Sequence, residues 1–163
     1  MTAANLPQKK SFITSDMDTC FAKAVEECEA FRLQGYSCAE SVLRALLNAF
    51  SLKVSDQFYK GVFAFAGGAV NDGRCGALEA GLAVLSLLYS KGRMESSYSL
   101  KEYSCMMHDI FKRINGSYLC SEIFYPRYDE YMKDHDSEDG FQCAFVTGLE
   151  ADYKFLQTYS IDI

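Results

Sequence analysis

The sequence predicts an all-α protein, a single-domain helical bundle of about five major helices plus a short one. Apolar residues recur at spacings of three and four over several long segments, whereas the alternation typical of strands is scarce. The 163 residues are 49% hydrophobic, which suits one domain with a sizeable core. Residues 1–15 are polar and aperiodic, so we expect a flexible N-terminal tail before a single domain at 16–163.

The first half of this domain contains three predicted helices. The first covers 16–34 and ends at Gly35, a residue suited to the left-handed position that follows many helices. The second begins after Ser37, and Glu40 three residues later completes a capping box. Ser55 precedes the third, whose apolar residues also recur at helical spacing.

The middle of the chain combines a loop with two long helices. Three glycines and an Asn-Asp pair predict a tight loop at 66–74. The strongly apolar segment 75–90 contains several small residues, and we expect it to be the central, most buried helix. An amphipathic helix follows at about 95–114, and Asn115-Gly116 ends it.

The last third of the chain predicts a short helix, a loop and a final helix. Ser117 is the expected cap of the short helix, and Pro126 is expected to break it. The polar, acidic segment 126–140 predicts a loop, and 142–157 predicts the last helix.

Composition and charge exclude several classes of function. The net charge of −6 and the absence of a large Lys/Arg cluster argue against nucleic-acid binding and against anionic membrane surfaces. No apolar run approaches the length of roughly 20 residues that a membrane span requires. The first residues lack the features of a signal peptide, so we expect no membrane insertion and a cytoplasmic location.

Cysteine is the residue type that points to chemistry. The chain has seven cysteines, and without an export signal such a surplus favours redox chemistry or metal binding. Four of them share one context, since each is expected in the first turn of a helix: Cys38, Cys75, Cys120 and Cys143. Unsatisfied amides and the helix dipole there stabilise a thiolate, which predicts lowered pKa values. A thiolate attacks disulfides and binds metals.

Among these four, we expect Cys75 to be the attacking thiolate. Its glycine neighbours would give access, and Arg74 would add positive charge. Glu79 is a further candidate, for handling protons, although a helix glutamate is more often solvated or a cap.

The remaining cysteines and the histidines carry weaker signals. Cys20, Cys28 and Cys105 are expected to fill the core as small apolar residues. His108 follows Cys105 by three residues, so the pair could share a helix face as metal ligands, but no second ligand pair at metal spacing accompanies it. His135 lies in an acidic segment and is expected to be solvated.

Four segments resemble the motifs of a bacterial and archaeal family of proteins described as redox-active and named for its cysteine signature. The segments are 35–43, which contains Cys38; 67–82, which contains Cys75; 116–120, which ends at Cys120; and Cys143 with its helical continuation. The resemblance covers about 30–158. One departure is Ala80 where the motif has its closing glycine, with Gly81 next. The resemblance implies an all-helical fold and redox activity of the four cysteines.

Three functions remain open from the sequence. The first is a thiol–disulfide oxidoreductase or electron-transfer protein that acts on a redox partner protein, a small thiol or an electron carrier. The second is a metal centre in which Cys38, Cys75, Cys120 and Cys143 bind zinc or an iron–sulfur cluster. The third is a non-catalytic helical interaction module. The sequence leaves the substrate and the oligomeric state open.

Overall fold

Helices form nearly all the regular structure of the chain. A computed structural model describes residues 14–90, 97–137, 143 and 145–158. Within these residues there are α-helices and short helical turns but no strand, which confirms the all-α class. None of the described helices is long and apolar enough to cross a membrane. The predicted tail falls mostly at 1–13, outside the described residues.

The first two helices begin and end where the sequence predicts. Helix α1 (Thr14–Leu33) ends before Gly35, whose φ of 88° is left-handed. Helix α2 (Cys38–Ala49) opens with a complete capping box. The Glu40 backbone N–H donates to the Ser37 hydroxyl at 3.2 Å, and the Ser37 backbone N–H donates to the Glu40 carboxylate at 3.3 Å.

Short helical segments lead from α2 to the next long helix. Helix α3 (Asp56–Val62) runs directly into the 3₁₀ turn η1 (Phe63–Phe65). The segment predicted as a tight loop instead contains a π-helical turn, η2 (Gly68–Asp72). Left-handed backbone at Gly68, with φ of 68°, lets the chain coil this tightly.

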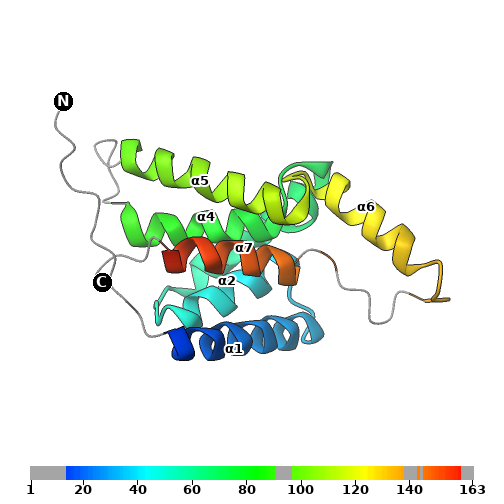
Figure 1. Cartoon of the computed structure of the whole chain (residues 1–163), viewed down its shortest axis with the longest axis horizontal. Coiled ribbons are helices and arrows are strands. Elements are labelled where there is room, and N and C mark those ends of the chain that lie inside the picture. The colour runs from blue at the N-terminus through cyan, green and yellow to red at the C-terminus, as the bar shows by residue number, and fades with distance from the viewer. Residues whose placement is uncertain (1–13, 91–96, 138–142, 144, 159–163) are drawn as a thin grey trace.

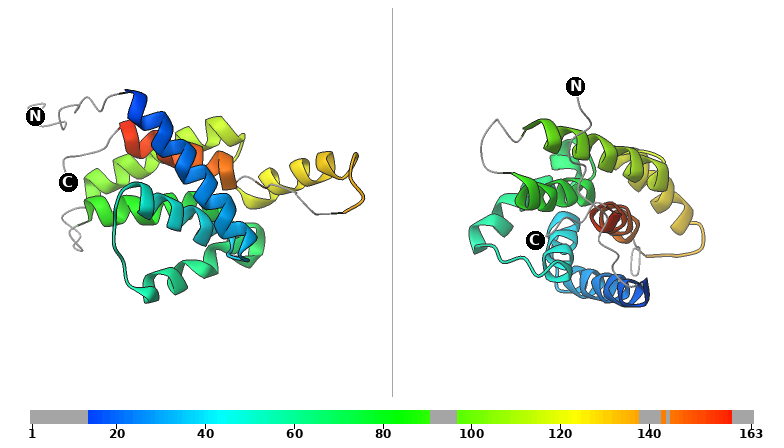
Figure 2. Two further views of the ribbon diagram at one scale, coloured as in Figure 1. Left: turned by 90° about the horizontal axis from the view of Figure 1, so that it is seen from below. Right: turned by 60° about the vertical axis from the view of Figure 1, so that its left-hand side comes forward.

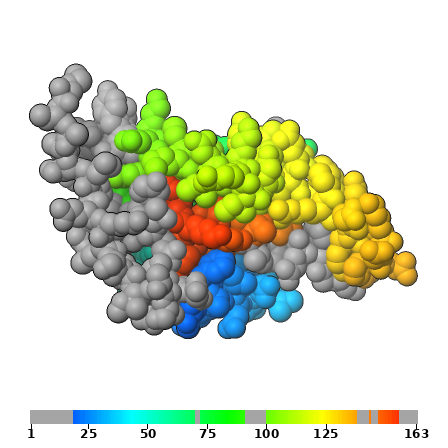
Figure 3. All heavy atoms as spheres, in the orientation of Figure 1, coloured from blue at the N-terminus to red at the C-terminus, as the bar shows by residue number. Residues whose placement is uncertain are grey.

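Four further helices complete the fold: α4 (Gly76–Tyr89), α5 (Ser97–Asn115), α6 (Cys120–Tyr131) and α7 (Phe145–Thr158). Helix α7 packs against α1, α2, α4 and α5, and Figure 2 shows it end-on with these helices around it. Helix α4 is deeply buried as predicted, but the central helix is α7. It reaches the surface in a strip between α5 and α1 (Figure 3).

The apolar core lies between these five helices. Its largest fully buried side chains come from α2, α4, α5 and α7: Phe111, Phe155, Leu43, Leu46, Leu47, Leu78, Leu85, Met107, Leu149, Val42 and Val84. Burial of this apolar surface is the main favourable term that holds the helices together.

Helix α6 extends away from the bundle (Figure 1) and contradicts one prediction. Pro126 lies inside this helix and does not break it, so part of the predicted loop 126–140 is helical. A proline removes one hydrogen bond of the helix. The stacked rings of Phe124 and Tyr128, with centroids 5.4 Å apart, join the turns on either side of it.

Candidate functional site

Helices α2, α4 and α7 begin at the same end of the bundle, where α6 also starts (Figure 1). The register of α4 and α7 shows that they run parallel. A Cβ on Gly148 would lie 2.5 Å from the Cβ of Ala77, and a Cβ on Gly81 would lie within 2.6 Å of both carboxylate oxygens of Asp152. The second contact lies four residues after the first in both helices. The helices therefore run in the same direction, and their N-termini lie side by side.

The cysteines follow these N-termini closely. Cys38 is the first residue of α2, Cys75 is the N-cap of α4, and Cys120 is the first residue of α6. Cys143 lies two residues before α7 rather than in its first turn, which corrects the prediction for that cysteine. The predicted cap of α6 is also displaced, because the N-cap is Leu119 and not Ser117. The Ser117 hydroxyl instead accepts the Leu119 N–H.

A backbone bridge fixes the positions of two of the cysteines relative to each other. The Cys75 N–H donates to the Tyr118 carbonyl at 2.8 Å, and the Cys120 N–H donates to the Gly73 carbonyl at 2.8 Å. These bonds flank an antiparallel bridge between Arg74 and Leu119. The start of α4 and the start of α6 are therefore fixed to each other, although 45 positions separate the two cysteines in sequence.

Glycines provide the space for two of the sulfur-bearing side chains. A Cβ on Gly76 would lie 3.1 Å from the Sγ of Cys38 and 2.7 Å from the Phe65 carbonyl oxygen. A Cβ on Gly68 would lie 2.8 Å from the Cβ of Cys120. Only a residue without a side chain fits at either position without a shift of its neighbours.

The other three predicted site cysteines lie within electrostatic range of Cys75. The thiols of Cys38, Cys143 and Cys120 each raise the pKa of Cys75, and Cys143 and Cys38 raise the pKa of Cys120. Cys75 is 5% exposed, while the other three are half-buried. The structure thus brings these four thiols together at one end of the bundle; their role in a reaction stays a prediction.

This arrangement agrees with a comparison to known protein families. Residues 36–153 match the profile of the family described as "Putative redox-active protein (C_GCAxxG_C_C)". The chain belongs to this family. No curated protein and no solved structure matches the chain.

The C_GCAxxG_C_C signature departs in this chain at its closing glycine, and the structure gives the physical consequence. Ala80 is fully buried, and the neighbouring Gly81 is the residue on which the carboxyl group of Asp152 packs. The close approach of α4 and α7 therefore depends on the glycine at 81.

Burial controls the acidity of the thiols in this redox-active family member. Burial raises the pKa of Cys75 to about 12, and the three neighbouring thiols raise it further, while the Ala77 backbone N–H opposes the rise. Burial, with Cys143 as the next cause, raises the pKa of Cys120 to about 11. The prediction of lowered pKa values is wrong for these two cysteines, because removal of the thiolate from water outweighs the helix N-terminus.

The side chain of Arg74 does not provide the positive charge that was predicted for Cys75. Its Nε lies 2.5 Å from the Glu79 carboxylate, and its Nη1 lies 3.4 Å from the Nε2 of His108. Because Arg74 makes these contacts, its positive charge does not stabilise a Cys75 thiolate. Cys75 is also buried, and both facts argue against it as the first attacking thiolate. The carboxylate of Glu79 forms an ion pair with Arg74.

The predicted metal alternative does not fit the described side chains. Zinc and iron–sulfur sites need several donors that converge on one point. No three His, Cys, Asp or Glu side chains in the described part of the chain are arranged to hold a metal ion. The proposed ligand pair of Cys105 and His108 has no third ligand in the described part of the chain, and the Nε2 of His108 lies 3.4 Å from the Nη1 of Arg74.

The other cysteines do not lie at helix starts, although Cys28 is also within electrostatic range of Cys38. Cys28 is fully buried, as predicted for a core residue, and its burial raises its pKa to about 12. Cys20 and Cys105 are exposed, so their assignment to the core is wrong. Helical periodicity alone could not place them, since a residue beside the apolar stripe can face solvent. His135 is exposed as predicted and stacks on Tyr131.

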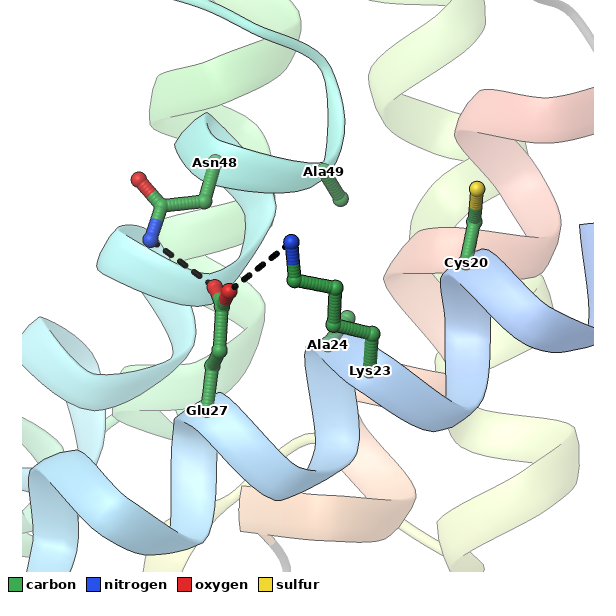
Figure 4. Close-up of a pocket in the computed structure, with 6 residues that line it drawn as sticks. All are labelled: Cys20, Lys23, Ala24, Glu27, Asn48 and Ala49. Carbon is green, nitrogen blue, oxygen red and sulfur yellow. Dashed lines mark hydrogen bonds and ion pairs between the residues drawn. The ribbon is translucent and has the colours of Figure 1, made fainter.

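A small surface hollow lies between α1 and α2, away from the thiols (Figure 4). It is lined by Cys20, Lys23, Ala24, Glu27, Asn48 and Ala49. Its acceptor, Glu27, already accepts a hydrogen bond from Asn48 at 2.8 Å and pairs with Lys23 at 3.7 Å. Asn48 and Ala49 are at the C-terminal end of α2, opposite to Cys38, so this hollow is not part of the thiol site.

Sequence reasoning missed Asp152, the most unusual polar group of the fold. Its side chain is fully buried in α7, and neither carboxylate oxygen has a hydrogen-bond partner. Burial raises its pKa well above the ordinary value of 3.8. A signal was present, because Asp152 occupies the same apolar helix face as Leu149 and Phe155.

Proposed function

We propose that this chain is a thiol–disulfide redox protein that uses Cys38, Cys75, Cys120 and Cys143. The observation that carries the proposal is that four thiols lie near one another at one end of the bundle, three at helix starts and Cys143 just before α7. Three of these cysteines are only half-buried. A purely structural role for buried cysteine would not require four of them at one centre. A cytoplasmic location, expected from the sequence, belongs to this proposal.

The order of attack follows from exposure. Cys38 is half-buried and first in α2, so it can meet a substrate disulfide, whereas Cys75 is only 5% exposed. We assign Cys38 as the attacking thiolate and Cys75 as the resolving thiol. A buried resolving thiol with a raised pKa reacts with the adjacent mixed disulfide instead of with outside molecules.

The reaction transfers two electrons to the substrate. The Cys38 thiolate attacks one sulfur of a substrate disulfide; a Cys38–substrate disulfide forms, the substrate S–S bond breaks, and the first thiolate leaves. The Cys75 thiolate then attacks the Sγ of Cys38, and the second substrate thiolate leaves. The two leaving thiolates take up the two protons that the protein thiols lost. The protein gains one Cys38–Cys75 disulfide.

A second pair, Cys120 and Cys143, would reduce this disulfide by the same exchange. Cys38 lies at the α2–α4 contact beside Cys75, where a Cβ on Gly76 would be 3.1 Å from its Sγ, and Cys120 and Cys143 are the two remaining half-buried site thiols. In this proposal electrons pass from Cys120 and Cys143 to Cys38 and Cys75.

Mass spectrometry after differential alkylation tests the proposal. The reduced protein is treated with a small disulfide, the remaining thiols are alkylated, and each cysteine is quantified. We expect reversible disulfides that join site cysteines to one another, whereas the exposed Cys20 and Cys105 should form only mixed disulfides with the reagent. Absence of any disulfide between two of the four site cysteines would contradict a specific redox site.

Substitutions test the assigned order. Cys75→Ser should accumulate a mixed disulfide at Cys38, because the resolving thiol is absent. Cys38→Ser should form no such adduct, and Cys105→Ser should behave as the unchanged protein. A mixed disulfide at Cys75 in the Cys38→Ser variant would reverse the assignment.

A further inference from the structure

The proposed redox site is bordered on one side by a surface that combines an exposed aromatic ring with positive charge. Tyr118 is 39% exposed, and its carbonyl accepts the N–H of Cys75. The ammonium of Lys112 lies 5.9 Å from the centre of the Tyr118 ring, and His108 meets the same ring edge-on at 6.2 Å. We call Arg74, His108, Lys112 and Tyr118 the Tyr118 surface.

Helix α5 and the backbone bridge hold this surface in place. His108 and Lys112 are one turn apart on α5, so both reach the same ring. Arg74 is held from the other side, since it contacts both Glu79 and His108. Arg74 directly precedes Cys75 in sequence, and the Tyr118 carbonyl accepts the Cys75 N–H. The Tyr118 surface therefore lies next to the thiols.

The charge of the Tyr118 surface is available to a binding partner. Glu79 neutralises Arg74 in part, but the Arg74 side chain remains half exposed. Lys112 is exposed and forms no ion pair within the part of the chain that the structure describes. The whole chain has a net charge of −6, so an acidic partner would be repelled by most of the protein and attracted here.

We propose that the Tyr118 surface is a docking site for an acidic peptide segment of a protein substrate that presents a disulfide to the thiols. This inference rests on the proposed thiol–disulfide function and adds the class of partner. Carboxylates of the segment would pair with Lys112 and Arg74, and the Tyr118 ring would contact its apolar groups. Aromatic and basic residues of this kind are enriched among the residues that dominate binding at protein interfaces.

Two synthetic peptides test the proposal with the full chain. Each carries one cysteine as a mixed disulfide with thionitrobenzoate, flanked by glutamates in one peptide and by lysines in the other. Release of the coloured thionitrobenzoate gives the rate constant of attack. We expect the glutamate peptide to react about five- to tenfold faster at low salt, and the two rates to converge in 0.5 M salt.

Charge reversal at two lysines of α5 shows whether the preference for the glutamate peptide arises at the Tyr118 surface. Lys112→Glu should remove or invert it, whereas Lys101→Glu, about 16 Å away along the same helix, should retain it. The neutral 2-hydroxyethyl disulfide should react equally with both variants, which verifies that the thiols and the fold are intact. Tyr118→Ser should slow the glutamate peptide more than the neutral disulfide.

The outcomes separate this inference from the proposed function. If no disulfide reacts, including the neutral one, the thiol–disulfide function fails. If the neutral disulfide reacts but the peptides react equally, or if Lys112→Glu retains the preference, the docking site is wrong. Faster reaction of a small anionic disulfide alone, without a preference between the peptides, would also overturn it.

Discussion

A methyl group on Gly76 would lie 3.1 Å from the sulfur of Cys38 across the α2–α4 interface. The start of α4, where Cys75 lies, can approach the proposed attacking thiol this closely only because residue 76 has no side chain. The Phe65 carbonyl oxygen, 2.7 Å from the same position, leaves even less room there. The residue that follows Cys75 thus limits how close α4 and Cys38 can be.

Gly76→Ala should therefore impair both stability and exchange. Forcing a methyl group into this contact is expected to lower the free energy of unfolding by about 1–3 kcal/mol. It should also slow formation of the Cys38–Cys75 disulfide, since Cys38 must move. Urea denaturation and quantification of the disulfide measure the two effects. Gly61→Ala in α3 is the matched control, because nothing lies within 4 Å of the added Cβ; normal exchange in Gly76→Ala would disprove the contact's role.

Gly68→Ala should displace Cys120. The left-handed backbone alone costs an alanine roughly 1–2 kcal/mol, and the added Cβ would also lie 2.8 Å from the Cβ of Cys120. Gly67→Ala isolates the first effect, since Gly67 has φ of 60° but nothing within 4 Å of its Cβ position. We expect Gly68→Ala to lose more stability in urea denaturation than Gly67→Ala. The added Cβ would also lie 2.7 Å from the backbone nitrogen of Gly73, so the extra loss reports both contacts, and equal losses would show that neither matters.

Local features of this fold could be predicted from the sequence, and features that depend on distant contacts could not. Gly35 and the capping box of Ser37 and Glu40 act within one turn, so their residue types were sufficient. The prediction that Pro126 ends a helix was wrong. It considered only the lost hydrogen bond and not the side chains of Phe124 and Tyr128, which stack across the proline.

The candidate site shows the same division. The sequence correctly predicted that Cys38, Cys75 and Cys120 lie at helix starts. The acidity of Cys75 and Cys120 was predicted with the wrong sign, because it depends on burial by elements far away in sequence. The bridge that joins their backbones leaves no sequence signal, since it pairs carbonyl and amide groups that every residue has.

The raised pKa values predict how the thiols respond to pH. Between pH 7 and 10 the alkylation rate of Cys75 should rise about tenfold per pH unit without a plateau, because its pKa of about 12 lies above that range. Cys120, with a pKa of about 11, should behave likewise. Iodoacetamide labelling followed by mass spectrometry measures both rates. A plateau below pH 9 at Cys75 would contradict its burial as a neutral thiol.

The same shifts affect stability at high pH. The pKa of Cys75 is above its ordinary value of 9.0, so the folded protein holds this proton more tightly than the unfolded chain. Its contribution to stability is full below pH 9 and is lost as the pH rises toward 12. Cys75→Ala should lessen this loss in denaturation measured from pH 8 to 10, whereas a substitution of the exposed Cys105 should not.

Asp152 should make the protein less stable as the pH rises above 4. Its pKa in the fold is well above the ordinary 3.8, so the unfolded chain releases this proton at a lower pH than the folded protein does. Stability from this group is complete below pH 3.8 and is lost as the pH rises through the folded pKa. Over that interval its contribution falls by about 1.4 kcal/mol per pH unit.

Asp152→Asn should remove this slope, because the amide does not ionise and nearly retains the shape that packs on Gly81. The difference in unfolding free energy between Asp152→Asn and the unchanged protein should increasingly favour the variant from pH 4 upward. Asp129→Asn, at an exposed position of α6, is the matched control and should leave the pH profile unchanged. Parallel profiles for Asp152→Asn and the unchanged protein would mean that the carboxyl group reaches water or a polar partner in the folded state.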